Sequence, residues 1–277
     1  MSKLLRGNFV RLFKSRIFWI CTAAIFCSAV FIMQMGGRAI EVRNVTMDEY
    51  FFYLGPMVSL FFSVFISMFI GTEHSDGTVR NKLIIGYSRK QVYLAYFLTC
   101  LGGIGIMLAV WFLGGLTGIP LIGLWKTGAA AVITNILITV LYSAVLTAIF
   151  VCFSVMMQNK AASAVAQIVF ALLLILAGST LYNRLYEPEQ ISGMVLVNGE
   201  IIMSEPEPNP MYIGGALRQI CIALVNMLPT GQGILMLNWD SSGSVPILIP
   251  LQIASSIVLA IVITALGVLV FRRKDLK

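Results

Sequence analysis

Charged side chains that could act together are concentrated in one short segment, residues 71–97, with the sequence GTEHSDGTVRNKLIIGYSRKQVYLAYF. Glu73 lies near its start, where an apolar run ends. A carboxylate at a low-dielectric boundary is costly unless it is paired. We therefore expect Glu73 to contact a basic residue of the N-terminal segment, such as Lys14 or Arg16.

Sequence motifs for catalysis are missing. The chain has no G-x-x-x-x-G-K-[ST] phosphate loop, no H-E-x-x-H and no G-x-S-x-G. Its single histidine, His74, is best explained as a solvated loop residue. We therefore predict no catalytic residue, no metal site and no cofactor on this chain.

The same charged segment is predicted to fold as a turn, a short helix and the start of a long helix. Residues 73–77 form the polar turn, residues 78–85 the short helix, and Gly86 its C-terminal stop. Ser88 and Gln91 fit a capping box that begins the long helix. The short helix offers an apolar patch and charge to a partner or to the bilayer, through Val79, Leu83, Ile84, Arg80 and Lys82.

The composition predicts a membrane protein. The chain is 58% hydrophobic and only 11% charged, whereas soluble domains carry about 25% charged residues. A bilayer core needs roughly 20 helical residues to cross it, and apolar runs inside it must be helical because no water pairs the backbone. Six runs qualify: Ile17–Gly37, Tyr50–Thr72, Gln91–Trp125 with a break near Gly118 and Pro120, Thr127–Asn159, Ala161–Asn183, and Ser241–Phe271 with its span from about Val245. We predict an all-α integral membrane protein with about six transmembrane helices in a single domain, residues 1–277.

Basic residues predict the orientation of these helices. With the N-terminus inside, the segments 1–16, 73–90, 158–160 and 272–277 are cytoplasmic and hold 5, 4, 1 and 4 Lys or Arg, which is 14 of the 19 in the chain. Short cytoplasmic segments are enriched in Lys and Arg. We therefore expect a multi-pass protein of the bacterial plasma membrane with both termini in the cytoplasm. The same distribution explains the net charge of +7 without a nucleic-acid partner.

The N-terminal segment, residues 1–16, is predicted to be a helix lying in the membrane surface. Its apolar face comprises Leu5, Phe9, Leu12 and Phe13. The basic residues around that face are Lys3, Arg6, Arg11, Lys14 and Arg16. Such a helix binds an anionic leaflet, so membrane lipids are expected partners. A simple positive anchor for the first span is the alternative.

The longest stretch between spans, residues 184–244, is predicted to be extracellular. Asn-Gly at 198–199, between two apolar runs, is a strong hairpin signal because both turn residues need φ > 0. Residues 211–228 show apolar residues at helical spacing. This helix lies on the membrane, dips into it or crosses it as a seventh span, and the sequence leaves the three alternatives open.

Few polar side chains lie inside the predicted spans, and none of them is ionisable. Proton- and ion-driven transporters usually rely on buried ionisable residues, so any transport by this chain is expected to draw its energy from another subunit. Asn135 and Gln167 are candidates for lining a substrate pathway. The commoner role of such residues is hydrogen bonding between helices.

The segment 73–83 resembles the permease subunits of type II ABC exporters. The pattern of that family is a Glu, three residues, Gly-Thr, an aliphatic residue and a short basic helix. The matching positions are Glu73, Gly77, Thr78, Val79, Arg80, Lys82 and Leu83. Other features also agree with the family. They are the basic amphipathic N-terminus, the six spans, the basic end from Phe271, and the large outer loop before the last span, with N-P-M-Y at 209–212 and L-P-T-G-Q at 228–232.

The resemblance implies a membrane pore made of two copies of this chain, or of this chain and a paralogue, bound to two cytoplasmic ABC ATPase subunits. ATP and Mg²⁺ would bind to those ATPase subunits. The helix at 78–85 would be a coupling helix seated in a groove of the ATPase, beside the N-terminal helix. Within the family, the chain looks most like Gram-positive permeases for antimicrobial or hydrophobic peptides.

Two other functions stay open at this point. One is a membrane immunity or sensor protein that binds an antimicrobial peptide without transport. The other is a membrane enzyme acting on lipids or peptides, which would need acid and base groups at an interface. The sequence also does not identify the substrate. It does not distinguish a homodimer from a heterodimer, or export from extraction out of the outer leaflet.

Overall fold

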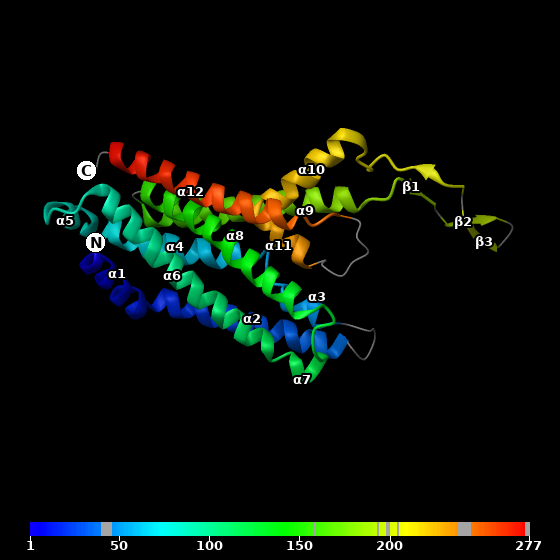
Figure 1. The fold of residues 1–277 in the computed structure, drawn as a ribbon, viewed down its shortest axis with the longest axis horizontal. Coiled ribbons are helices and arrows are strands. Elements are labelled where there is room, and N and C mark those ends of the chain that lie inside the picture. Colours follow the sequence, from blue (N-terminus) through cyan, green and yellow to red (C-terminus); the bar gives the residue numbers. More distant parts are fainter. Residues whose placement is uncertain are drawn as a thin grey trace.

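Six helices that are long and apolar enough to cross a membrane run along one axis in the computed structural model (Figure 1). They are α2 (Arg16–Ala39), α4 (Val58–Ser75), α6 (Arg89–Leu116) continued by α7 (Ile119–Ile122), α8 (Ala129–Met156), α9 (Lys160–Tyr186) and α12 (Ile249–Arg273). The structure describes residues 1–39, 46–157, 159–192, 194–197, 200–203, 205–237 and 245–274. The prediction of an all-α membrane protein with about six spans is confirmed.

Two spans begin later than the sequence suggested. The second was expected from Tyr50, but that residue belongs to a separate short helix, α3 (Met47–Phe51), and α4 starts only at Val58. Pro56 lies between the two helices, and proline both lacks a donor and disfavours a helical residue before it. The last span was expected from about Val245, but α12 begins at Ile249, with a proline in its first turn where the ring fits a helix.

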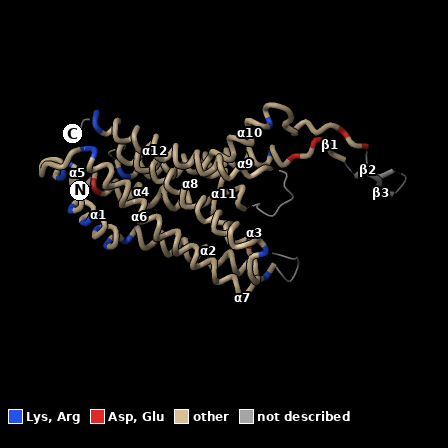
Figure 2. Tube along the Cα trace, viewed as in Figure 1, with Lys and Arg blue, Asp and Glu red and all other residues tan. Residues whose placement is uncertain are grey.

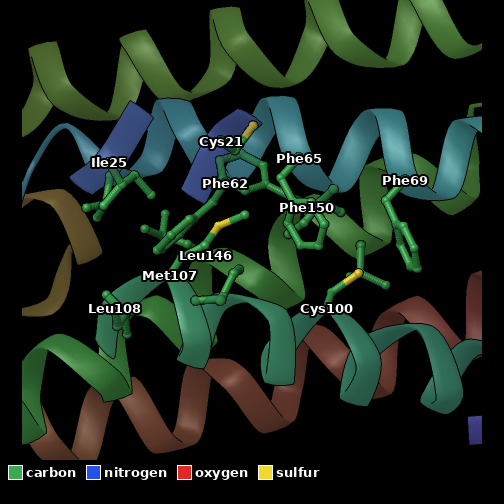
Figure 3. Packing of buried hydrophobic residues seen from close by; sticks show 14 of the residues in the cluster. Cys21, Ile25, Phe62, Phe65, Phe69, Cys100, Met107, Leu108, Leu146 and Phe150 are labelled. Atoms are coloured by element: carbon green, nitrogen blue, oxygen red, sulfur yellow. The ribbon is translucent and has the colours of Figure 1, made fainter. Parts of the chain in front are cut away.

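Helix α8 is the centre of the bundle and packs against α4, α6, α9 and α12. Aromatic and aliphatic side chains fill the space between these helices. Figure 3 shows Phe62 and Phe65 of α4 close to Leu146 and Phe150 of α8 and to Met107 of α6. All five side chains are buried, so α4, α6 and α8 form one continuous hydrophobic core.

Gly114 and Gly118 form a G-x-x-x-G pattern near the end of the third span, and this pattern packs two helices of the chain together. Gly114 and Gly118 face α2, and a Cβ atom at Gly114 would lie 2.9 Å from the Cβ of Ala29. Such glycines let two backbones approach closely. This packing of α6 on α2 explains the pattern without a second copy of the chain.

Both termini lie at the same end of the bundle, as six crossings require (Figure 1). That end also holds α1 (Ser2–Lys14), which precedes α2, and α5 (Thr78–Ile84), which connects α4 to α6. Lys and Arg residues are concentrated there (Figure 2). We call it the basic end, defined by α1, α5 and the adjoining ends of α4, α6, α8 and α12.

The opposite end carries short strands that extend away from the bundle (Figure 1). β2 (Met194–Val197) pairs antiparallel with β3 (Glu200–Met203), and Val197 faces Glu200. β1 (Gln190–Ile191) pairs with β4 (Glu207–Pro208) at the base. The predicted hairpin is confirmed in its strands, while its turn residues, Asn198 and Gly199, lie outside the described residues.

The predicted helix at 211–228 is the first half of a bent pair. α10 (Gly215–Met227) and α11 (Pro229–Leu237) meet at 96°. At the bend, the hydroxyl of Thr230 donates to the carbonyl of Leu174, in the middle of α9, at 2.6 Å. The pair therefore dips into the bundle and is not a straight seventh span.

Candidate functional site

The segment after the second span folds closely as predicted. α4 ends at Ser75, and Gly77 turns the chain with φ of 67°, which a glycine adopts without strain. α5 then runs for seven residues, about 10 Å at 1.5 Å per residue. Gly86, with φ of 101°, stops it. The predicted capping box at the start of α6 is present, since Ser88 and Gln91 bond each other's backbone N–H groups.

Glu73 is the centre of a buried group of polar side chains at the basic end. Its side chain is only 4% exposed. The ammonium of Lys82 donates to both carboxylate oxygens, at 2.7 and 2.6 Å. The guanidinium of Arg11 forms an ion pair with the same carboxylate, and the hydroxyl of Tyr96 donates to it. A carboxylate from α4 is therefore held by α1, α5 and α6 at once.

Two further contacts tie α1 into this group. Arg11 donates to the carbonyl of Phe69 at 3.2 Å, and its guanidinium lies 4.0 Å from the centre of the Phe69 ring. The amide oxygen of Asn8 accepts from the ammonium of Lys82 at 3.0 Å. We call these residues the Glu73 cluster: Asn8, Arg11, Glu73, Lys82 and Tyr96.

The Glu73 cluster holds its charges at a cost. Burial, and secondly the positive charge of Arg11, lower the pKa of Lys82 to about 7. Burial also lowers the pKa of Arg11. Removing one partner from a buried ion pair leaves an uncompensated charge and typically costs about 3–5 kcal/mol. Each member of the cluster therefore depends strongly on the others.

Glu73 contacts the N-terminal helix as predicted, but the predicted partners, Lys14 and Arg16, were wrong. Lys14 and Arg16 are exposed at the corner between α1 and α2. Arg11 makes the contact instead, because it lies on the side of α1 that faces the bundle with Leu4, Asn8 and Leu12. Phe9 is half-buried and packs against Gly102 of α6, as expected for the apolar face of this helix.

The predicted outward patch of the short helix needs a correction. Val79 is buried and Leu83 is half-buried against the core, so the face they share points into the bundle. Isoleucines at the C-terminal end of α5 are exposed instead, Ile84 at 73% and Ile85 at 76%. Arg80 is exposed as well. The exposed surface of α5 and the residue that follows it therefore includes Arg80, Asn81, Ile84 and Ile85.

Gly77 and Thr78, which were also predicted to take part in coupling, hold the segment together. Gly77 makes the turn, and the hydroxyl of Thr78 donates to the carbonyl of Glu73 at 3.2 Å. This bond closes the turn between α4 and α5. Thr78 and Lys82 thus anchor both ends of the short helix to Glu73.

The candidate pathway residues lie inside the bundle. Gln167 is fully buried, and its amide donates to Ser154 at 2.7 Å and to Ser163 at 2.9 Å. Asn135 is also buried. The bond of Gln167 to Ser154 favours a role in joining α9 to α8. Asn135 is packed within the bundle, and its side-chain oxygen has no hydrogen-bond partner among the described residues.

Sequence reasoning missed Asn8, Tyr96 and Ile85. The sequence could have indicated that Asn8 is buried, because it lies at helical spacing between two apolar residues, Leu4 and Leu12, which are buried in the fold. Tyr96 carried none, since it lies in the middle of an apolar run. Among the described residues, no group of three His, Cys, Asp or Glu side chains is arranged to hold a metal ion.

Residues 13–207 match a family described as "Protein of unknown function (DUF2705)". The match covers well over half of the chain, so the chain belongs to this family. It ends before α10, α11 and α12 and includes α4, α5 and α6 with Glu73, Lys82 and Tyr96. No curated protein sequence matches the chain.

Proposed function

We propose that this member of the family is the transmembrane permease subunit of an ABC exporter. In this function it forms a substrate pathway with a second copy of itself or with a paralogue. It catalyses no reaction, and ATP and Mg²⁺ bind to separate cytoplasmic ATPase subunits. The cargo class is hydrophobic or antimicrobial peptides, which suits spans without ionisable residues.

The observation that carries the proposal is the bracing of α5 by the Glu73 cluster. A seven-residue helix at the end of a bundle is too short to be stable alone. Here it is fixed through Lys82 to Glu73 of α4, and through the same carboxylate to Arg11 of α1 and Tyr96 of α6. A displacement of α5 would therefore be transmitted to α1, α4 and α6, as expected of an element that couples the bundle to the motion of an ATPase.

The exposed surface of α5 supports docking of a protein. Ile84 and Ile85 are adjacent, large and apolar, and Arg80 lies one turn away. Interfaces are commonly dominated by a few apolar side chains that enter a pocket of the partner. A charge at the rim adds association rate and salt dependence. Ile84 and Ile85 would enter the groove of the ATPase, and Arg80 would lie at its rim.

The distribution of charge supports a cytoplasmic position for α5. Lys and Arg gather at the end that holds both termini (Figure 2), and cytoplasmic segments are enriched in these residues. With this orientation α1, α5 and both termini face the cytoplasm of a bacterial cell. The ATPase subunits would then meet α5 from the cytoplasmic side.

The test is co-purification with an ABC ATPase, which the proposal expects to be encoded by a neighbouring reading frame. The chain is expressed with that ATPase, and the ATPase retained per permease is measured at matched membrane levels. We expect the double variant Ile84→Asp/Ile85→Asp to retain at least tenfold less ATPase, because two charges replace the apolar contact.

The matched control is Leu124→Asp. Leu124 is 69% exposed and lies at the opposite end of the bundle, in the segment after α7. It should retain the ATPase like the unmodified chain. Equal retention by all three proteins, or no ATPase bound to any of them, contradicts the proposal and leaves peptide binding without transport as the better description.

A further inference from the structure

A groove of about 570 Å³ lies between α6 and α12 at the basic end. Most of its lining is apolar, and two basic residues lie at the helix ends that border it. The lining residues are Lys90, Leu94, Phe97, Ala260, Ile261, Thr264, Ala265, Val268, Leu269 and Arg272. None of them is acidic.

The two basic residues are brought together by the way the helices are joined. Arg89, at the start of α6, donates to the carbonyls of Phe271 at 3.2 Å and Arg272 at 3.1 Å, at the end of α12. This fixes the first turn of α6 beside the last turn of α12. The side chains of Lys90 and Arg272 are both exposed there.

The depth of the groove is set by a close contact of the same two helices. A Cβ atom at Gly267 would clash with the hydroxyl of Tyr93, so the absence of a side chain lets α12 approach α6. Farther along α12, small side chains at Ala260 and Ala265 leave the space between Leu94, Phe97 and Leu269 open. The groove thus has apolar walls and one charged end.

Those features select a ligand of mixed character. An apolar molecule would gain nothing from two exposed cations, and a small hydrated anion would gain nothing from the apolar lining. A phospholipid with an anionic headgroup satisfies both, because its acyl chain covers apolar surface at about 0.8 kcal/mol per buried CH₂ and its phosphate pairs with Lys and Arg. The charged end of the groove also lies where the spans end, at the level of headgroups.

We propose that an anionic phospholipid of the adjoining leaflet binds in this groove. Its headgroup lies against Lys90 and Arg272, and an acyl chain follows the groove past Leu94 and Phe97. The bound lipid joins α6 to α12 on the membrane-facing side. This inference stands on the groove alone and does not rest on the proposed transport function.

The test is retention of lipid by the purified full-length chain. The protein in mild detergent is mixed with phosphatidylglycerol or phosphatidylcholine, and the bound lipid is counted by native mass spectrometry. Each cation near an anionic lipid surface is worth about 1 kcal/mol, close to fivefold. We therefore expect Lys90→Gln/Arg272→Gln to bind phosphatidylglycerol roughly 30-fold more weakly.

A second variant tests the acyl-chain part without changing charge. Ala265→Trp fills the groove from its exposed side and should reduce the binding of phosphatidylglycerol. The charge control is Arg38→Gln/Lys126→Gln, which removes two exposed cations at the other end of the bundle and should leave binding unchanged. Equal binding of the two lipids, equal loss in the control, or full binding by Ala265→Trp overturns the proposal.

Discussion

The two polar centres of this protein differ in kind. The Glu73 cluster, at the basic end, pairs one carboxylate with two cations. The second centre lies where α10 meets α11 beside the start of α12, and it consists of neutral groups only. We call it the amide network, made of Asn226, Gln232, Gln252 and Ser256, all of which are buried.

The amide network holds the dipping pair α10–α11 in place. The side-chain oxygen of Asn226 accepts from the amide of Gln252 and from the backbone N–H of Leu248, both at 2.9 Å. Gln232 donates to the carbonyl of Asn226 at 2.9 Å and to the hydroxyl of Ser256 at 3.1 Å. α10, α11 and α12 are therefore joined at one point inside the bundle.

The difference reflects the solvent around each centre. Charges are expensive within a bilayer, whereas neutral amides and hydroxyls can bond between helices there at little cost. The Glu73 cluster can be ionic because α1 and α5 bring its cations from outside the spans. The Glu73 cluster therefore joins α1, α4, α5 and α6 through charged groups, whereas the amide network joins α10, α11 and α12 through neutral ones.

The largest expected effect comes from breaking the charged centre. Glu73→Gln leaves Arg11 and Lys82, which are both partly buried, without a counter-charge, and this should lower the free energy of unfolding by up to about 3–5 kcal/mol. Thermal unfolding in detergent, followed by circular dichroism, measures this loss. Glu205→Gln is the control, because Glu205 is exposed and lies beside the strands at the opposite end of the bundle. A melting temperature for Glu73→Gln equal to that of the control would show that the cluster does not stabilise the fold.

Breaking the neutral centre should cost somewhat less. Asn226→Leu leaves Gln252 and the backbone N–H of Leu248 without their acceptor, and buried unpaired groups should cost about 3 kcal/mol in total. The same melting measurement applies. Gln34→Leu serves as its control, since Gln34 is an exposed amide in α2 and should tolerate the change.

A third variant tests whether backbone contact, besides the amide network, fixes α11. A Cβ at Gly233 would lie 2.7 Å from the carbonyl carbon of Gly55 and 2.8 Å from the nitrogen of Pro56. Gly233→Ala should therefore destabilise the protein by about 1–2 kcal/mol through overpacking. At Gly105 a Cβ meets nothing within 4 Å, so Gly105→Ala should leave stability unchanged or raise it by up to about 1 kcal/mol. Equal melting temperatures for the two variants would contradict the close packing of α11.

The smallest effect is expected at the rim of the α5 surface. Under the proposed function, Arg80→Gln should slow association with the ATPase a few-fold at low salt and have almost no effect at high salt, because rim charges act mainly on the association rate. Surface binding kinetics at two salt concentrations measure this. A loss as large as that of Ile84→Asp/Ile85→Asp would place Arg80 inside the interface instead.

At the basic end, the sequence predicted where the helices begin and end better than it predicted which of their faces point into the bundle. Long charge-free runs, Gly86 and the Ser88–Gln91 box identified the spans and the short helix, since each depends on local chemistry. The direction of α5 was not predictable, because Val79 and Leu83 make as good a surface for a partner as for the bundle. Only the packing of α5 on α4 and α6 decides that they turn inward.

The dipping pair illustrates a second limit. No helix was predicted over residues 229–237, which follow the expected helix at 211–228 and contain Pro229, Gly231 and Gly233. In the fold, proline begins α11 and the glycines allow close contact with α9 and the turn before α4. Such contacts between distant segments leave no local pattern. The partner of Glu73 was missed for the same reason. Arg11, Lys14 and Arg16 are all basic, and only the packing of α1 on the bundle decides which of them reaches Glu73.

The most direct test of the proposed coupling is photocross-linking from Ile85. A photoreactive phenylalanine analogue is placed at Ile85 or, as a control, at Leu124, and cells that express the neighbouring ATPase are irradiated. We predict a cross-linked product containing the ATPase from position 85 and none from position 124. No product from position 85, at membrane levels equal to the control, would contradict the assignment of α5 as the docking element.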